Sequence, residues 1–166
     1  MKGKRKSFAR DLCPIARSLD AIGDWWSLLI IRDALRGLRR FGEFQRSLGL
    51  ARNILTARLA KLVARGIMKR VPAADGSAYR EYVLTEKGER LVLVLTALGQ
   101  WGAASLFSPN EKRGVICDSR TSEPLPPIEL RGRDGRLIGA GDTVLRVDER
   151  GRGRLASARK PRRAAE

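Results

Sequence analysis

The sequence predicts a mainly α fold that carries one small antiparallel hairpin, an α+β arrangement. Several stretches between residues 13 and 107 repeat apolar residues every three or four positions, which is typical of amphipathic helices. After Gly66 the apolar period shortens to that of strands, and Asp75-Gly76 supplies a turn signal between two such runs. A chain of 166 residues is expected to hold one compact domain with an appendage.

Two helices are predicted at the start of the main domain, and the first of them is short. Pro14 suits the first turn of a helix that ends before Gly23. Asp24 can cap a second helix from Trp25 to about Arg36. A wide apolar stripe predicts that this second helix is central to the core, and the stripe consists of Trp26, Leu29, Ile30, Ala34 and Leu35.

The next two predicted helices form a closely spaced pair. Phe41, Phe44 and Leu48 share one face of a short helix that stops at Gly49. The stretch 50–65 repeats apolar residues and is followed by Gly66, so it reads as a second helix. Two short helices joined by a tight turn predict a helix-turn-helix.

A basic hairpin and a long apolar helix are predicted to follow. The strand-like runs are 67–71 and 79–84. Thr85 is a plausible N-cap for a helix that extends to about Phe107. The apolar surface of this helix is broader than one small domain can bury, which indicates a partner helix from a second subunit.

The chain is therefore divided into four parts. We expect a basic N-terminal arm (1–11), the main and dimerisation domain (12–107), a small β-rich appendage (108–149) and a basic disordered tail (150–166). The appendage is predicted from four short β-like runs and the Asp134-Gly135 turn signal; the runs are 115–117, 128–131, 137–138 and 143–147.

Composition narrows the function classes. The chain has 34 Lys and Arg against 18 Asp and Glu, a net charge of +16 that favours a polyanionic partner such as nucleic acid. It has no histidine, and its two cysteines lack the paired spacing of a zinc site, so we expect neither an enzyme nor a metal or other cofactor. No apolar run approaches the roughly 20 residues of a membrane span, and no apolar stretch follows the basic N-terminus, so a cytoplasmic protein without a membrane partner is expected.

The helix 50–65 carries the functional prediction. With Leu55 pointing inward, Leu59 and Leu62 also point inward, whereas Asn53, Thr56, Ala57 and Ala60 form a small outward face that fits the major groove of DNA. Arg58 and Arg65 are expected at its edges. The hairpin supplies further cations, as a wing does. The predicted contacts to double-stranded DNA are Arg40, Arg52, Asn53, Thr56, Lys61, Lys69, Arg70, Ser77 and Arg80.

The sequence resembles the HxlR-type family of winged helix-turn-helix regulators over roughly residues 12–107. The runs that carry the resemblance are Cys13-Pro14-Ile15, Ile22-Gly23-Asp24, Trp26 to Ile30, Arg32-Asp33, Arg40-Phe41, Leu55-Thr56, Gly66-Ile67 and Tyr82 to Thr85. The resemblance implies a homodimeric repressor or activator that binds a palindromic operator. It also implies a recognition helix at 51–65, a wing at 67–84 and dimer contacts from the first and last helices.

The sequence departs from the family pattern in three places. Ala51 stands where a capping Ser or Thr is common, and Trp25 stands where a polar residue is usual. The family pattern also gives little guidance from residue 108 onward.

Two regulatory hypotheses and one alternative function remain open. Cys13 precedes a helix N-terminus, which can favour a reactive thiolate, so it is either a redox sensor or a small apolar filler. A small-molecule effector pocket is the second hypothesis, with core packing as its rival; the candidate residues are Trp25, Trp26, Trp101 and Phe107. The alternative function is a sequence-neutral nucleoid or RNA-binding protein, which competition with unrelated DNA would distinguish.

Overall fold

The computed structural model describes residues 7–147 and divides into two units at Ile128, which are treated separately below. The first unit, described from residue 7 to residue 128, contains the helices and the hairpin. The second, described from residue 129 to residue 147, contains a turn and a short 3-10 helix, η1 (Ala140–Asp142). The predicted basic tail (150–166) and residues 1–6 of the predicted arm lie outside the described residues.

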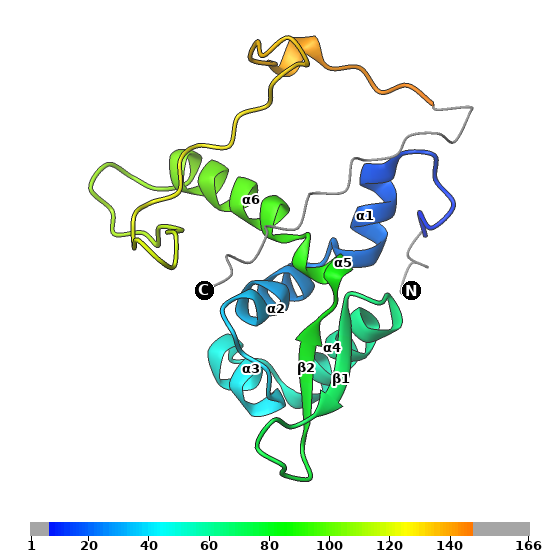
Figure 1. Cartoon of the computed structure of the whole chain (residues 1–166). Helices are drawn as coiled ribbons and strands as arrows, with labels where there is room; N and C mark the ends of the chain where they lie inside the picture. The colour runs from blue at the N-terminus through cyan, green and yellow to red at the C-terminus, as the bar shows by residue number, and fades with distance from the viewer. Residues whose placement is uncertain (1–6, 148–166) are drawn as a thin grey trace, which may run out of the picture. The chain divides into compact units, whose positions relative to one another are not determined.

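The first unit follows the predicted order of elements (Figure 1). Four helices precede a two-stranded antiparallel sheet, and two helices follow it. The helices are α1 (Pro14–Ile22), α2 (Trp25–Leu35), α3 (Phe41–Leu48), α4 (Arg52–Ala64), α5 (Glu86–Glu89) and α6 (Val92–Ser105), and the strands are β1 (Met68–Pro72) and β2 (Arg80–Leu84). The mainly α fold with a small β-hairpin is thus confirmed.

The core lies where α2, α3 and α4 meet beneath the hairpin. Ile30 and Ile31 of α2 are fully buried, as is Phe44 of α3. From α4, the residues Leu55, Leu59 and Leu62 are also fully buried, which confirms the predicted inward face of this helix. Burying an aliphatic side chain of this size contributes about 1.5–3 kcal/mol, so this row fixes how α4 is rotated about its axis.

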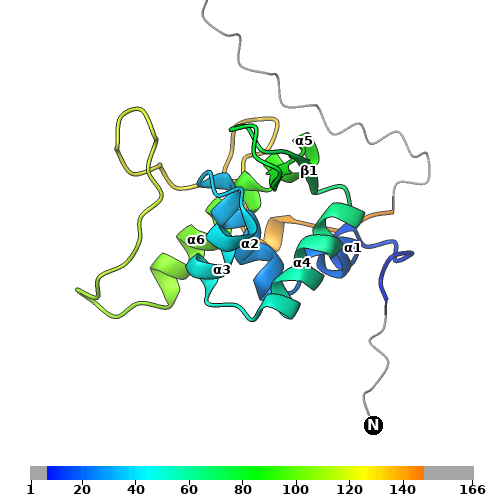
Figure 2. The same cartoon turned by 90° about the horizontal axis from the view of Figure 1, so that it is seen from below.

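The chain turns sharply between α3 and α4. Gly49 ends α3 with a φ of +63°, a left-handed conformation that lets the chain turn sharply before α4 begins. At the start of α4, Ala51 provides no side-chain cap. Seen from below, α4 runs between α3 and α1 (Figure 2).

The hairpin is bonded to the rest of the unit through its second strand. Its register pairs Met68 with Leu84 and Pro72 with Arg80. The Tyr82 N–H donates to the carbonyl of Arg39, 2.8 Å away, just before α3. These bonds leave the turn between the strands as the part that projects furthest from the core (Figure 1).

The predicted single helix from Thr85 to about Phe107 is wrong in one respect, because it is divided into α5 and α6 at Arg90 and Leu91. The Thr85 hydroxyl accepts from the Gly88 N–H (3.2 Å) and donates to the Gly66 carbonyl (2.7 Å), which holds α5 against the start of β1. A Cβ at Gly88 would lie 2.2 Å from the Ile67 carbonyl oxygen. This close contact fixes the short helix, and the apolar helix begins only after the chain has turned.

The predicted β-rich appendage does not form a sheet within the described residues. Residues 108–128 belong to the first unit and contain one isolated bridge, Cys117 to Pro124. In the second unit, Arg131 bridges to Leu137 around the predicted Asp134-Gly135 turn. Each β-like run lacks a neighbouring strand long enough to pair with it, and isolated short hairpins are marginal.

The described end of the predicted arm contacts α1. The Phe8 N–H donates to Asp20 Oδ1 of α1 at 3.2 Å. Within the described part of the chain, no helix combines the length and apolarity needed to cross a membrane.

Candidate nucleic-acid interface

The outward face of α4 is small, polar and exposed, as predicted. Arg52, Asn53 and Thr56 are exposed, and so are Ala57 and Ala60. The Thr56 hydroxyl donates to the Arg52 carbonyl of its own helix at 2.8 Å, which leaves the hydroxyl oxygen able to accept a further bond.

Arg52 is oriented by an aromatic neighbour. Its guanidinium carbon lies 5.6 Å from the centroid of the Phe41 ring, in cation–π range. Phe41 is the first residue of α3, so the contact joins the starts of the two helices. The stacking restrains the arginine while leaving its N–H groups available.

A carboxylate from α2 anchors the edge of α4. Asp24 caps α2 by accepting from the Ser27 N–H (2.9 Å) and hydroxyl (2.8 Å). The same carboxylate lies 3.2 Å from Arg58 Nε and 3.3 Å from Lys61 Nζ. Burial raises the pKa of Asp24, but the bonds from Ser27 and the two cations outweigh that effect and lower it overall. The carboxylate therefore remains ionised between the two helices at neutral pH.

The ion pair with Asp24 involves Lys61, which is one of the predicted DNA contacts. The Lys61 side chain is 26% exposed and its ammonium group is paired with Asp24, not directed freely outward. Arg58 lies at the edge of the helix, as expected. Arg65, the other expected edge residue, pairs with Asp20 of α1 at 2.8 Å. Sequence patterns did not identify these pairs because the partners lie 34–45 residues apart, beyond any local spacing rule.

A second buried carboxylate joins α2 to α3. Asp33 is completely buried, and its Oδ2 accepts from the Ser47 hydroxyl at 2.7 Å. Its Oδ1 accepts from Arg32 Nε at 2.9 Å. Both carboxylate oxygens are thus satisfied, and the first helix of the helix-turn-helix is fixed to the central helix of the core.

The wing is tied to the start of α3 through Arg40. The Arg40 guanidinium is hydrogen-bonded to Asp75 at the tip of the wing, and its Nε lies 3.6 Å from Glu81 Oε1 on β2. The hydrogen bond from Arg40 holds the pKa of Asp75 well below its usual range. The Ser77 N–H also donates to Asp75, at 3.1 Å. Arg40 and Ser77, both predicted DNA contacts, therefore meet at this tip.

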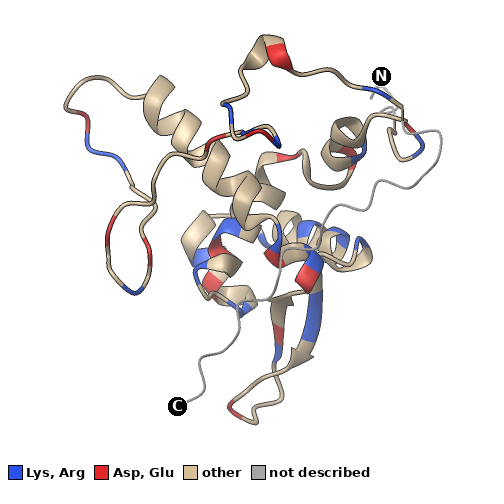
Figure 3. Cartoon of the chain, turned by 45° about the horizontal axis from the view of Figure 1, so that its top comes forward, with Lys and Arg blue, Asp and Glu red and all other residues tan. Residues whose placement is uncertain are grey.

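The remaining predicted cations lie on the exposed strands of the wing. Lys69 and Arg70 of β1 are exposed, as is Arg80 of β2, and Arg70 lies over the Tyr82 ring at 5.8 Å. Within residues 7–147, neither these three nor Arg52 has a carboxylate within 4.0 Å. Basic positions are spread over α4 and the wing strands (Figure 3). Their charge is available to an anionic partner.

The predicted sensor and pocket residues are dispersed. Cys13 is half-buried at the N-cap of α1 and Cys117 is exposed, and both are free thiols. Trp25 is 73% exposed with its ring edge against Trp26 (centroids 6.2 Å apart), whereas Trp26 packs against the core. Trp101 and Phe107 are 58% and 39% exposed. None of the four aromatic residues lines the groove found beside α6.

Apolar side chains remain exposed on the first and last long helices. On α1 these include Ile15 and Leu19. On α6 they include Leu93, Leu98 and Trp101. The broad apolar surface predicted for the last helix is therefore present.

Comparison with known proteins places this arrangement among transcriptional regulators. An uncharacterized HTH-type transcriptional regulator of Mycobacterium tuberculosis, Rv3095, is 38% identical over 117 residues, which cover 70% of this chain and 65% of the relative. The chain thus spans less than two thirds of that relative's length.

Two solved structures extend the likeness. That of PA1607, described as a transcription factor, is 48% identical with a TM-score of 0.81 and covers 86% of this chain and 100% of its own. That of PA1374 from Pseudomonas aeruginosa, also described as a transcription factor, is 38% identical with a TM-score of 0.59 and covers 83% and 94%. Because the model of the HxlR-like helix-turn-helix matches residues 21–109, more than half of the sequence, this chain belongs to the HxlR-like helix-turn-helix family.

Proposed function

We propose that the protein is a transcriptional regulator that binds a specific double-stranded DNA site by inserting α4 into the major groove. The observation that carries the proposal is the division of α4 into a buried apolar row and an exposed, small, polar face. An α-helix fits the major groove only if such a face is free and the helix is anchored from behind. The Asp24 pairs and the buried leucines provide that anchor.

Individual roles follow from side-chain chemistry. Asn53 is suited to adenine, Arg52 to guanine or a phosphate, and Thr56 to a phosphate. The wing would contact flanking phosphates through Lys69, Arg70, Ser77 and Arg80. Arg40 and Lys61 each pair with a carboxylate, so a phosphate would compete with that carboxylate or share the remaining N–H donors.

We further propose that the protein acts as a homodimer on a roughly palindromic operator. The exposed apolar residues of α1 and α6, among them Leu19, Leu98 and Trp101, supply a surface that a second copy can cover. A two-fold dimer presents two copies of α4 to successive major grooves, so the DNA site mirrors the symmetry of the protein.

Regulation by oxidation at Cys13 is part of the proposal. Cys13 lies at the start of α1, next to the surface assigned to the dimer, so a modified thiol there would disturb the contact between copies. Operator binding should fall after peroxide treatment and recover with a thiol reductant, and Cys13→Ser should remove this response while Cys117→Ser keeps it. A response that persists in Cys13→Ser rejects the redox role.

The first experiment measures fluorescence anisotropy on the DNA upstream of the protein's own gene and on a shuffled duplex of equal length. Discrimination that persists at higher salt supports specific readout, because salt weakens the phosphate contacts shared by both duplexes. Asn53→Ala should reduce discrimination at one base pair. Lys69→Ala should lower the affinity for both duplexes by the same factor. Lys112 is an exposed cation outside the interface, so Lys112→Ala should change neither affinity.

The second candidate is a sequence-neutral nucleoid or RNA-binding protein. The observation that favours it is the net charge of +16 together with the wing cations that have no carboxylate within 4.0 Å among residues 7–147. Equal binding of both duplexes that disappears with salt would support this candidate and reject specific readout.

A further inference from the structure

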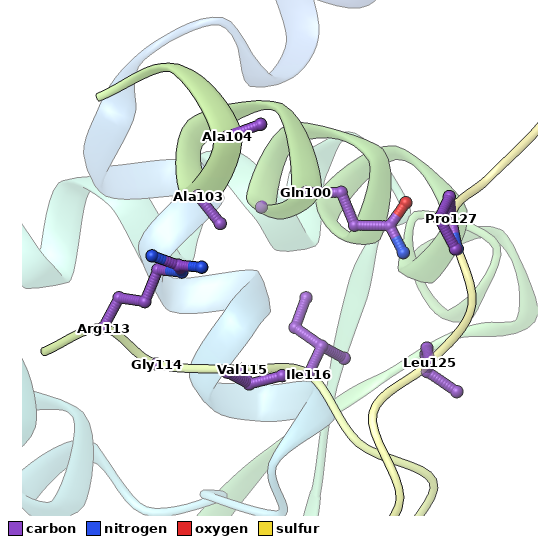
Figure 4. Close-up of a pocket in the computed structure, with 10 residues that line it drawn as sticks. Gln100, Ala103, Ala104, Arg113, Gly114, Val115, Ile116, Leu125 and Pro127 are labelled. Carbon is purple, nitrogen blue, oxygen red and sulfur yellow. The ribbon is translucent and has the colours of Figure 1, made fainter. Parts of the chain in front are cut away.

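A groove of about 410 Å³ lies between α6 and a later segment, residues 113–128, which is called the return segment here (Figure 4). Both walls belong to the first unit. Sites for small ligands commonly measure about 300–1,000 Å³ and are mostly apolar with a few polar groups. The volume of the groove falls in this range, and most of its lining is apolar, although the groove is open to solvent on one side.

The α6 wall is built from small residues. Gly99, Ala103 and Ala104 face the groove, so the backbone of the helix can be approached closely. A Cβ on Gly99 would lie 3.0 Å from Cδ1 of Ile116, which shows that the return segment packs onto the glycine. The groove therefore lies beside the packing contact between Gly99 and Ile116.

The opposite wall is held by one side chain of α6. The Gln100 amide nitrogen donates to the Pro126 carbonyl at 2.8 Å, and its amide oxygen accepts from the Ile128 N–H at 2.8 Å. The return segment is closed on itself by a bond from the Leu125 N–H to the Ile116 carbonyl, 2.9 Å. The match of PA1607 to 86% of this chain is too long to end at α6, so it includes part of the chain after that helix.

Among the polar side chains that line the groove, one charged group has no carboxylate partner in the described residues. Gln100 uses both ends of its amide on the return segment. Arg113 has no carboxylate within 4.0 Å in the part of the chain that the structure describes, and no hydrogen bond of its side chain is found there. Its guanidinium extends from the return segment towards Ala103 (Figure 4). The other lining side chains are aliphatic or absent.

From these features we infer that the groove binds a small apolar monocarboxylate, with its carboxylate on Arg113 and its hydrocarbon body along the small residues of α6. A guanidinium and a carboxylate form two parallel charge-assisted hydrogen bonds, which orient the ligand. The groove has a single cation in a mostly apolar lining, which suits a ligand with one negative charge and an apolar body. A ligand here would press on α6, which connects to the wing through α5, so the inference supplies an effector site to the proposed regulator.

The test uses the full-length protein, with benzoate and octanoate as flat and linear probes and their neutral amides as controls. Saturable binding is measured by calorimetry and by the shift in Tm. We expect both carboxylates or one of them to bind, and the matching amide to bind at least about tenfold more weakly, since it cannot pair with the guanidinium. Equal binding of acid and amide, or no saturable binding of any probe, overturns the inference.

Two variants locate the site. Arg113→Gln should weaken carboxylate binding about tenfold or more, whereas Arg120→Gln, an exposed arginine on the same segment that does not line the groove, should leave it unchanged. Ala103→Leu fills the hollow with Arg113 intact and should abolish binding. Unaltered binding in Arg113→Gln rejects the site.

The competing occupant of the groove is an apolar side chain of a second copy. In that case no probe binds to the wild type, and Ala103→Leu shifts the dimer towards monomer in sedimentation. This outcome rejects the ligand while leaving operator binding of the wild type intact, so it is distinguishable from a failure of the proposed function.

Discussion

The Asp24 carboxylate offers the sharpest test of how α4 is anchored, because one side chain both caps α2 and pairs with two cations of α4. Loss of an N-cap side chain costs about 1 kcal/mol. Removing the carboxylate also takes the hydrogen bond from Lys61 Nζ and the ion pair from Arg58, which adds about 1–3 kcal/mol. Asp24→Ala should therefore lower the free energy of unfolding by about 2–4 kcal/mol.

Asp24→Asn separates the two contributions. Asn caps helices as well as Asp does but carries no charge, so this variant should be more stable than Asp24→Ala by about 1 kcal/mol. Urea unfolding at equal protomer concentration measures both, since dimerisation makes stability depend on concentration. Glu89→Gln, which removes an exposed carboxylate with no ion pair among the described residues, is the control and should change little.

The pH dependence of stability gives an independent check. The pKa of Asp24 is held below its ordinary value of 3.8, so its ionised form stabilises the folded state above that pH, and this contribution is lost as the pH falls through the lowered value. The difference in stability between wild type and Asp24→Asn should be constant above about pH 5 and shrink in acid. If Asp24→Ala and Asp24→Asn are both as stable as the wild type, the proposed anchor does not exist.

Three further predictions concern contacts that hold the interface in place. Gly88→Ala should lower the free energy of unfolding by more than about 2 kcal/mol in urea, because the new Cβ would overlap a backbone carbonyl. The control is Gly42→Ala, which should be tolerated because the atom nearest to its Cβ lies 3.6 Å away. Equal stability of the two variants would contradict the close contact at Gly88. Ser47→Ala should cost about 1 kcal/mol, because the buried carboxylate of Asp33 loses one hydrogen bond; no change in the urea midpoint would mean that this bond does not hold α3. Asp75→Ala should increase the affinity for the shuffled duplex and make that affinity depend more steeply on salt, because Arg40 loses its carboxylate partner. Anisotropy measures both quantities. An unchanged affinity would show that this arginine lies out of reach of DNA.

The parts of the fold set by local signals were predictable from the sequence. The inward row of α4 follows from the spacing of Leu55, Leu59 and Leu62, and all three are fully buried. The wing follows from a change of apolar period around Asp75-Gly76. Each of these signals depends on residues a few positions apart, which a single sequence contains.

The parts that depend on distant partners were not predictable. The division between α5 and α6 results from Gly88 lying against the Ile67 carbonyl, a contact across 21 residues that leaves no periodic trace. The β-like runs after α6 have strand composition but find no strand to pair with. At the candidate interface, Lys61 was predicted as a DNA contact, but its partner Asp24 was recognised only as a helix cap. An ion pair between helices depends on how they cross, and crossing angles are not encoded in spacing.

The two-sided construction of α4 has a consequence for how such proteins diversify. The positions that hold the helix in place, the leucine row and the residues paired with acidic side chains, do not overlap with Asn53, Thr56, Ala57 and Ala60. Exchanges at exposed positions of this kind usually alter stability by no more than about 0.5 kcal/mol. Under the proposed function, a duplicated copy of the gene can therefore change its DNA target one substitution at a time at little cost in stability.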